Sequence, residues 1–499
     1  MVTAQEETDT FAKAGASFEE MLCWLEGTES AALTHAELED QVERRGSEVQ
    51  RLMFQDHLDL RALREDRVRV VDAVGIVHAS VEPAHGRQLS TVVGTVSVSR
   101  LAYRQLGPSN LHPAAGVLNL PVELHSHGLR RLAAIESTRG SFDDASAAIE
   151  RSTGVAVAKR QVESLTAAAA DVEDFYAQRA PEPDTSTDVV VISVDGKGIV
   201  MRPDALREAT AKAASAATRR LETRLSKGEK RYRKRMAEVG AVYDLEPVAR
   251  SAADVLASKH DDSASAPPAP KATGKWVTAS VAEDAAEVVA RVFDEAERRD
   301  PGHQRCWVAL VDGNNHQIDR INAEAENREL TVTVLVDLIH VMEYIWSAAW
   351  CFFAQGDQAA EDWVRAKTLA VLEGNARDVA AGIRRRASTA RLTKAKRKNA
   401  DACATYLTNK APYFDYPSAL AAGWPIATGI IEGTCRYLVA DRMDITGARW
   451  SVDGAEAVLK LRAIQANGDF NDYWCFHLDH ERQRVHETRY AGGVIPLAA

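Results

Sequence analysis

The chain has 499 residues, a formal net charge of −11, and charged side chains at 27% of its positions. This length is too great for one compact core, so we expect roughly two to four domains. The composition is that of an ordinary globular protein, and no run of about 18 apolar residues predicts a membrane span.

Six cysteines are scattered along the chain, and no two of them form a CxxC pair. Their spacing predicts neither a zinc ribbon nor a disulfide framework, and it fits a reduced, cytoplasmic compartment. The acidic N-terminus lacks the basic start and apolar core of a secretory signal, so we expect none.

The charge is unevenly distributed. Acidic residues gather at positions 6–43, where Lys13 is the only Lys or Arg, whereas residues 219–235 and 384–398 are strongly basic. Such local clusters can bind a phosphate backbone, although solvated helix faces or mobile arms are the alternative interpretation. The candidate DNA-binding residues in these segments are Arg231, Arg233, Lys234, Arg235, Lys396, Arg397 and Lys398.

The first 180 residues predict three segments. Residues 1–65 are expected to be helical, and residues 66–124 to be β-rich with strands around Gly94. Residues 125–180 predict two helices, the first capped by Ser141 and Asp144 and ended by Gly154. They outline either a helix-turn-helix that reads DNA or a plain helical hairpin. The residues that would contact DNA at the start of the second helix are Lys159, Arg160 and Gln161.

Residues 188–337 predict an α/β domain. We expect strands at 189–194, 236–243, 307–311 and 330–336, a helix at 284–299, and a flexible loop at 258–275. The remaining chain is expected to be all-helical at 338–425, to return to the sheet at 426–470, and to end in a loose tail at 471–499. We find no internal repeat.

Three of these apolar strands each precede an aspartate: Asp195, Asp312 and Asp337. Strand ends in α/β sheets are where ligand-binding groups gather, and carboxylate oxygens suit Mg²⁺. Glycine after Asp195 and after Asp312 would let the chain turn sharply away. The alternative is that these aspartates only form turns, since Asp-Gly is also a hairpin signal. The pattern alone therefore predicts a metal-dependent α/β enzyme.

Glu432 is the candidate third carboxylate. It follows Thr428 and Gly429 and is expected at the start of a helix, where negative charge is favourable. On spacing alone, an ordinary acidic residue at a helix N-terminus is the better explanation of Glu432.

Several segments resemble those of bacterial insertion-sequence DDE transposases of the ISKra type, relatives of the Mutator-like group. The segments are ISVDGKGIVMR, VALVDGNNHQI, VLVDLIHVMEYIW, TGIIEGTCRYLVADRM and GARWSVDGAEAVLKLRA. The resemblance covers roughly residues 89–467, and DLIH and IEGTCR are its most specific parts. It implies a multi-domain α/β plus α protein with an RNase H-like core, a mixed sheet flanked by helices, and an all-helical insertion before the glutamate.

The resemblance also implies the site residues. Asp195, Asp312 and Glu432 match the family's catalytic carboxylates, which hold two Mg²⁺ (or Mn²⁺) ions. Asp337 and His340 match its C/D-x-x-H signature, which would support the site or contact DNA. A rival assignment makes Asp337 the second metal ligand and leaves Asp312 in support, and the glycine after Asp312 favours the first assignment.

Further side chains have two interpretations each. Arg436 and Arg449 would neutralise phosphate oxygens, or instead pair with nearby aspartates. Trp346 and Trp350, four residues apart, would stack on an extruded base or pack in the insertion core. His340 taken alone would be a core histidine.

One departure from the family concerns the N-terminal region. Many relatives carry a cysteine-rich zinc ribbon there, whereas this chain has only Cys23. Recognition of DNA ends would then rest on other features, such as the strand segment and the helical pair.

The sequence thus predicts a transposase that cuts and joins DNA at terminal inverted repeats. Its expected partners are transposon ends, target DNA and further copies of itself, in the bacterial cytoplasm at the nucleoid. The alternatives are a transposase-derived, non-catalytic DNA-binding regulator and an RNase H-like nuclease without strand transfer.

Overall fold

A computed structural model of the chain describes residues 10–181, 188–216, 233–257, 267–427, 429–445 and 447–497. The chain divides into two compact units. Unit 1 comprises Met1–Ala177 with Asp469–Ala499, and unit 2 is Gln178–Gly468. Among the described residues, no helix is both long and apolar enough to cross a membrane.

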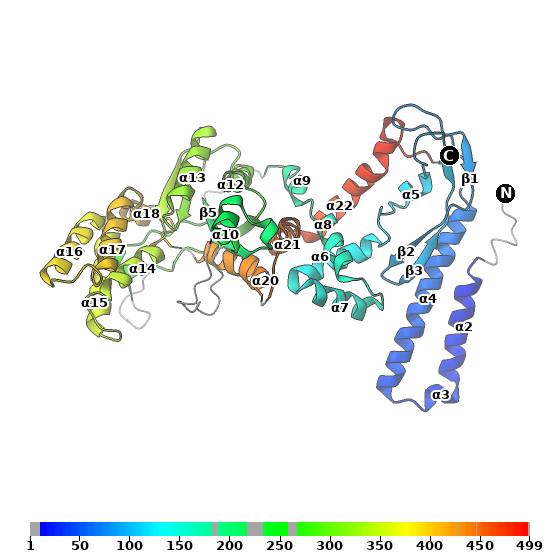
Figure 1. The fold of residues 1–499 in the computed structure, drawn as a ribbon, viewed down its shortest axis with the longest axis horizontal. Helices are drawn as coiled ribbons and strands as arrows, with labels where there is room; N and C mark the ends of the chain where they lie inside the picture. The colour runs from blue at the N-terminus through cyan, green and yellow to red at the C-terminus, as the bar shows by residue number, and fades with distance from the viewer. Residues whose placement is uncertain are drawn as a thin grey trace. The chain divides into compact units, whose positions relative to one another are not determined.

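Unit 1 begins with a helical hairpin. Helix α2 (Ala12–Glu26) packs along α4 (His35–Leu63), with the single turn of α3 (Thr28–Ala31) between them (Figure 1). Thr34 and Glu37 form a capping box that fixes the start of α4. The helical expectation for this region is confirmed over its described residues.

The β-rich segment of unit 1 is small. Strands β2 (Arg87–Thr91) and β3 (Gly94–Val98) form an antiparallel hairpin under α4, and β1 (Ser80–Glu82) pairs with β4 (Ala102–Arg104). Gly94 has φ +115°, so the strands turn there as expected. The segment that follows carries Pro108, Pro113 and Pro121 and contains a short helix, α5 (Pro113–Val117).

Three further helices of unit 1 pack around one core: α6 (His127–Arg139), α7 (Phe142–Thr153) and α8 (Lys159–Ala168). Their shared apolar residues are Leu129, Ala133, Ala145, Ile149, Val157, Val162 and Leu165. The Ser141–Asp144 capping box begins α7, and Gly154 ends it in a left-handed conformation with φ +68°. Both signals were readable from the sequence. The short α9 (Val172–Ala177) follows.

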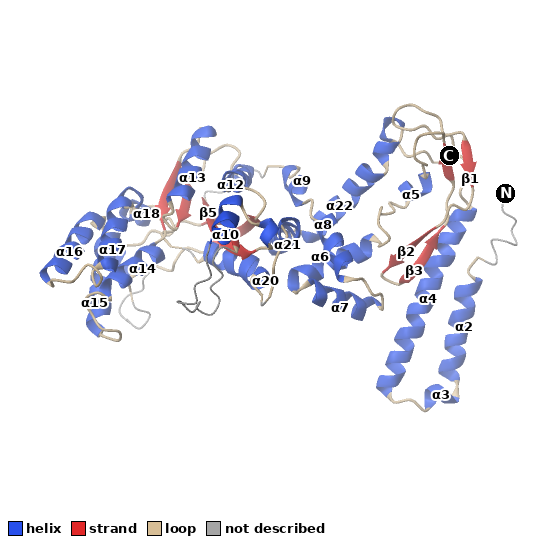
Figure 2. Ribbon diagram, in the orientation of Figure 1, coloured by secondary structure: helices blue, strands red, loops and turns tan. Residues whose placement is uncertain are grey.

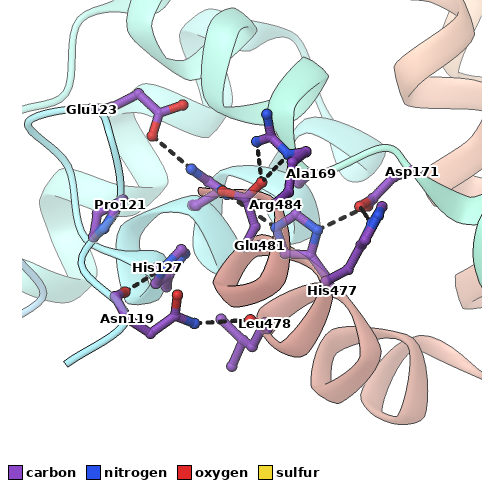
Figure 3. A network of polar contacts seen from close by, with 12 residues as sticks. Asn119, Pro121, Glu123, His127, Ala169, Asp171, His477, Leu478, Glu481 and Arg484 are labelled. Carbon is purple, nitrogen blue, oxygen red and sulfur yellow. Dashed lines mark hydrogen bonds and ion pairs between the residues drawn. The ribbon is translucent and has the colours of Figure 1, made fainter. Parts of the chain in front are cut away.

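The C-terminal segment is not the loose tail that we expected. It forms α22 (Phe470–Val485) and two 3₁₀ turns, Glu487–Arg489 and Ala491–Gly493. Buried His477 and Glu481 of α22 contact buried Arg130 of α6, and His477 also contacts Asp171 (Figure 3). The expectation of a loose tail missed this helix, although Phe470, Tyr473, Trp474 and Leu478 recur at helical spacing and the Tyr473 and Trp474 side chains are buried.

Unit 2 is built on a five-stranded mixed sheet in the order β7-β6-β5-β8-β9. The strands are β5 (Val189–Val200), β6 (Lys234–Leu245), β7 (Ala272–Ser280), β8 (Trp307–Val311) and β9 (Val332–Val336). β5, β6 and β7 are antiparallel, whereas β5, β8 and β9 are parallel. The expected mixed sheet is confirmed, and β7 begins inside the segment that we expected to be a loop.

Helices flank this sheet. Helix α12 (Ala285–Arg299), capped by Asp284, packs on β5, β6 and β7. Helix α12 lies close to the sheet, since a Cβ on Gly240 of β6 would be 2.3 Å from the Val292 side chain of the helix. Helix α13 (Asn315–Asn327) links β8 to β9, and α21 (Val452–Ala466) packs on β7. Smaller elements are Pro203–Ala205, α10 (Glu208–Ala216), α11 (Ala252–Val255) and α20 (Asp441–Met443).

The segment between β9 and the glutamate region is helical, as expected. It contains α14 (Leu338–Ala349), α15 (Gln358–Leu372), α16 (Ala376–Thr389), α17 (Lys398–Asn409), a 3₁₀ turn (Ala411–Tyr413) and α18 (Tyr416–Ala421). Figure 2 shows these helices without any strand among them.

Candidate active site

Asp195, Asp312 and Asp337 occupy equivalent positions along the neighbouring parallel strands β5, β8 and β9. Ser193 pairs with Leu310, and Leu310 pairs with Leu335. Two residues farther along each strand are Asp195, Asp312 and Asp337, and the Asp337 N–H donates to the Val311 carbonyl across 2.8 Å. Neighbouring strands lie about 4.8 Å apart, so this register places three carboxyl groups along one edge.

Asp195 does not end its strand, contrary to our expectation. β5 continues to Val200 and stays paired with β6, whereas its other neighbour, β8, stops at Val311. Asp195 therefore lies where β5 passes the end of β8. Gly196 makes space rather than a turn, because a Cβ there would lie 2.9 Å from Cε of Met236 on β6.

The turn that we expected after Asp312 is present. Gly313 has φ +90°, a conformation that side chains other than glycine rarely adopt. Oδ1 of Asp312 accepts a 2.7 Å hydrogen bond from the Asn314 N–H, which helps to fix the turn.

The glutamate segment lies against the first aspartate. Helix α19 (Ile430–Thr434) packs on β5 and β6, and it continues into a π-helical stretch, Cys435–Ala440. The buried Cys435 thiol donates to Oδ2 of Asp195 across 3.4 Å. Glu432 precedes Cys435 by three residues, so the two side chains share one face of the helical segment.

Burial raises the pKa of the Cys435 thiol, and the neighbouring Asp195 carboxylate raises it further. The thiol therefore keeps its proton at neutral pH and acts as a donor to Asp195 rather than as a nucleophile.

Asp312 and Asp337 differ in their surroundings. Asp337 is 5% exposed, and its Oδ1 caps α14 by accepting from the Ile339 N–H across 2.8 Å. Asp312 is half-buried, and no hydrogen bond to its Oδ2 is found in the described part of the chain. The exposed Glu432 carboxylate likewise accepts none from the described residues. Asp312 and Glu432 thus keep oxygen atoms available for a ligand.

Tyr406 of the helical insertion also reaches this end of the sheet, a role that no sequence motif indicated. Its hydroxyl donates to the Asp312 carbonyl across 3.0 Å, and its ring stacks on Tyr344 with centroids 3.9 Å apart. Burial raises the pKa of Tyr406, and Tyr344, Asp312 and Asp337 raise it further. The hydroxyl is therefore protonated and sits beside both aspartates.

A second contact joins the insertion to the same turn. Nζ of the buried Lys410 donates to Oδ1 of Asn315, at the start of α13. Tyr406 and Lys410 thus hold the turn after Asp312 from the side of α17.

The expected supporting residues lie mostly at the surface. His340 is 3.3 Å from Glu343 and 41% exposed, so it is not a core histidine. Arg436 is 82% exposed and 3.9 Å from Asp441, a loose ion pair, and Arg449 is exposed. Both arginines remain accessible to a phosphate.

Trp346 and Trp350 stack on each other, with ring centroids 5.2 Å apart. Trp350 is 43% exposed, so this ring is not part of the insertion core. The core side of α14 is formed by smaller residues, among them Val341, Ile345 and Ala348.

The candidate DNA-binding residues of α8 are partly engaged within unit 1. Lys159 pairs with Asp143 of α7, and the Gln161 side chain accepts from the Ala158 N–H across 3.2 Å. Arg160 is exposed. Gln161 therefore serves as a helix cap, a local role that its position at the helix start favours.

Some basic residues of unit 2 are exposed to solvent, whereas others contact protein groups. Arg233, Lys234, Lys396 and Lys398 are exposed. Arg235 donates to the Ala282 carbonyl across 2.9 Å, and Arg397 pairs with Asp401 at 2.8 Å. The prediction for Arg231 lies outside the described residues.

No family model matches this chain, and no curated protein sequence matches it. Among solved structures, the chain is similar to the Drosophila P element transposase strand transfer complex, with a TM-score of 0.24 and 9% sequence identity. That similarity covers 70% of this chain and 79% of the other.

Proposed function

We propose that this protein is a DDE-type DNA transposase that cuts DNA at terminal inverted repeats and joins the ends to a target. The observation that carries the proposal is the 3.4 Å contact between Cys435 and Asp195. It brings the segment containing Glu432 to the sheet edge where Asp195 and Asp312 stand level. Among the described residues, the carboxylates of Asp195, Asp312 and Glu432 do not form a group with ligand atoms within 4.8 Å of one another, so the proposal requires the Glu432 side chain to join the two aspartates when metal binds.

The donor set at this edge fits hard divalent cations. Mg²⁺ and Mn²⁺ prefer carboxylate oxygens and keep some water ligands. Asp312 and Glu432 have carboxylate oxygens without protein hydrogen bonds among the described residues. Asp195, Asp312 and Glu432 would therefore hold the two metal ions. Asp337 would support the site as the cap of α14 rather than as a ligand.

When bound, two such ions activate a water or 3′-hydroxyl and stabilise the leaving oxygen of a phosphodiester. The protein's own contribution is to hold carboxylates on a rigid edge. Tyr406 fixes the backbone after Asp312, and Cys435 orients Asp195. Arg436 and Arg449, exposed on the stretch after Glu432, would neutralise phosphate oxygens.

The RNase H-like core that the sequence resemblance implies is part of this proposal. Its expected features are a mixed sheet flanked by helices and an all-helical insertion between the second aspartate and the glutamate. Unit 2 has such a sheet, and α14 to α18 occupy that interval. The DNA would be bound chiefly through exposed basic residues such as Arg160, Lys396 and Lys398, because phosphate contacts supply most of the affinity.

The test is an assay of Mg²⁺-dependent cleavage and strand transfer on a plasmid that carries the DNA flanking the coding gene. Asp195→Asn, Asp312→Asn and Glu432→Gln are expected to abolish both products while DNA binding largely survives. Glu326→Gln, which removes an exposed carboxylate on α13, is the matched control and should keep activity. Cleavage that persists in the Asp195 or Glu432 variant would overturn the assignment.

Two other outcomes identify the alternatives. Sequence-specific DNA binding without any Mg²⁺- or Mn²⁺-dependent product would indicate a non-catalytic regulator. Cut ends that never become joined to target DNA would indicate a nuclease without strand transfer.

A further inference from the structure

Lys197 lies on β5 two residues beyond Asp195, where the strand has already passed the end of β8. Side chains of a strand alternate between its two faces, so Lys197 and Asp195 point to the same face of the sheet. The Cys435 thiol contacts Asp195 on that face. Lys197 therefore stands on the side of β5 that carries the candidate metal ligand.

Glycines on both sides of Lys197 leave it as the one side chain in this part of β5. Each glycine is required on the opposite face of the strand. A Cβ on Gly196 would lie 2.9 Å from Cε of Met236, a residue of β6. A Cβ on Gly198 would lie 2.8 Å from Cδ of Lys234, also on β6. The strand thus offers one side chain to an approaching ligand here, and that side chain is a cation.

The charge of Lys197 is not used within the protein. Its partner across the strand pair is the fully buried Ala237, so the lysine stem has an apolar surface to pack on while its ammonium group stays in solvent. Lys197 forms no ion pair within the part of the chain that the structure describes. The two oxygens of Asp195 accept instead from the Gly196 N–H, across 2.6 Å, and from Cys435. The cation is therefore available to an anionic ligand.

The length of a lysine side chain matches the distance to the candidate metal site. Two residues along an extended strand span about 6.6 Å, and a lysine stem of four carbons reaches roughly 6 Å from its Cα. A phosphate oxygen on a metal ion held by Asp195 would lie within about 4 Å of that carboxylate, since each ligand oxygen is about 2.1 Å from the ion. The ammonium group of Lys197 can consequently contact such a phosphate.

We propose that Lys197 is a catalytic residue that donates a hydrogen bond to a non-bridging oxygen of the scissile phosphate and neutralises its charge. The inference rests on the proposed transposase function and adds to it the cation that binds the reacting group. Phosphoryl transfer spreads negative charge over the non-bridging oxygens in the transition state, and a cation held in place there lowers the barrier. Arg436 and Arg449 would supply charge from the segment after Glu432, whereas Lys197 supplies it from the sheet.

The test measures single-turnover, Mg²⁺-dependent cleavage at saturating DNA. Lys197→Ala is expected to lower this rate about 10- to 100-fold, the effect of losing one charge-assisted hydrogen bond. DNA affinity should fall less than about threefold, because other phosphate contacts remain. Lys197→Arg should restore part of the rate. Lys212→Ala, which removes an exposed lysine of α10, is the matched control and should cleave like the wild type. Helical content and Mn²⁺ binding should be the same in all of these variants.

Asp195→Asn separates this inference from the proposed function. Cleavage that Asp195→Asn abolishes but Lys197→Ala leaves unchanged would overturn the role of Lys197 and leave the transposase assignment standing. A Lys197→Ala defect that disappears at saturating DNA would also overturn it, because the lysine would then contribute only to general DNA affinity. Weaker Mn²⁺ binding in this variant would do the same, since Lys197 would then shape the metal site. A wild-type chain without any Mg²⁺-dependent product would overturn the proposed function and this inference together.

Discussion

Cys435 and Asp195 are 240 residues apart in the sequence, and the thiol of the first donates to the carboxylate of the second across 3.4 Å. This contact closes the candidate site, since it joins the helix that follows the glutamate to the first strand of the sheet. It also makes Cys435 a positioning residue, because the thiol holds one oxygen of Asp195 in place.

Removing this donor should impair the proposed reaction mildly. Cys435→Ala is expected to lower Mg²⁺-dependent cleavage about three- to tenfold, because one hydrogen bond contributes about 0.5–1.5 kcal/mol. Cys435→Ser keeps a donor at the same position and should retain most of the activity. A serine variant as impaired as the alanine variant would show that packing of the thiol, and not its hydrogen bond, matters.

The insertion helix α17 should affect the site through Tyr406. Tyr406→Phe removes the hydrogen bond to the Asp312 carbonyl but keeps the ring that stacks on Tyr344. We expect cleavage to require a higher Mg²⁺ concentration, because the lost hydrogen bond contributes about 0.5–1.5 kcal/mol to holding the backbone at Asp312. Tyr344→Phe is the matched control, because it preserves the stack and the Tyr406 hydroxyl. Equal metal titrations for Tyr406→Phe and wild type would contradict this role.

The turn after Asp312 should not tolerate a side chain. Gly313 has φ +90°, and a Cβ there would lie 2.8 Å from the Tyr406 hydroxyl oxygen. Gly313→Ala is therefore expected to displace Tyr406 and to lower cleavage by more than tenfold, beyond the backbone strain of about 1–2 kcal/mol.

Gly468→Ala separates strain from displacement. Gly468 has φ +81°, and its Cβ would meet no atom within 4 Å, so this variant carries the strain alone. It should lose thermal stability and keep its cleavage rate. If both glycine variants lost activity to the same degree, the contact with Tyr406 would be irrelevant.

Unit 1 should lose stability in mild acid. The pKa values of His112 and His127 are lowered to about 4, mainly by burial, and the adjacent Arg100 and Arg130, respectively, lower them further. An unfolded histidine titrates near 6.5, so the unfolded state binds more protons between about pH 4 and 6.5. As the pH decreases through this window, the free energy of unfolding therefore decreases too, by at most about 1.4 kcal/mol per pH unit for each histidine.

Hydrogen exchange of α6 peptides at pH 7 and 5, corrected for intrinsic rates, would measure this effect. His127 donates to the Asn119 carbonyl at 2.9 Å (Figure 3), and His127→Gln keeps a donor that does not titrate. The variant should show a smaller pH dependence than the wild type but keep part of it, because burial also lowers the pKa values of His112, His125 and His486 in unit 1. Unchanged protection of the wild type between the two pH values would contradict the prediction.

Local signals in the sequence predicted much of the fold. Ser141 and Gly154 bound α7 because capping and a left-handed glycine are properties of a few neighbouring residues. The strand before Asp312 was also predicted, since five consecutive apolar residues precede a Gly-containing turn. Both signals involve residues that are close in the chain.

Features that depend on distant partners were not predicted. Asp195 was expected to end its strand, but β5 continues because β6 pairs with its whole length. The roles of Cys435 and Tyr406 arise from contacts with residues 240 and 94 positions away, which no local pattern reports. The anchoring of α22 through His477 and Glu481 escaped notice for the same reason.

The most direct test of the proposed metal site is Mn²⁺ binding to the full chain, followed by electron paramagnetic resonance. We predict that Asp195→Asn, Asp312→Asn and Glu432→Gln each weaken Mn²⁺ binding by at least about tenfold, or 1.4 kcal/mol, whereas Asp337→Asn does not. Unchanged binding in the Glu432 variant would contradict the three-carboxylate site. Loss of binding in the Asp337 variant, with Asp312→Asn unaffected, would instead assign the second metal ligand to Asp337.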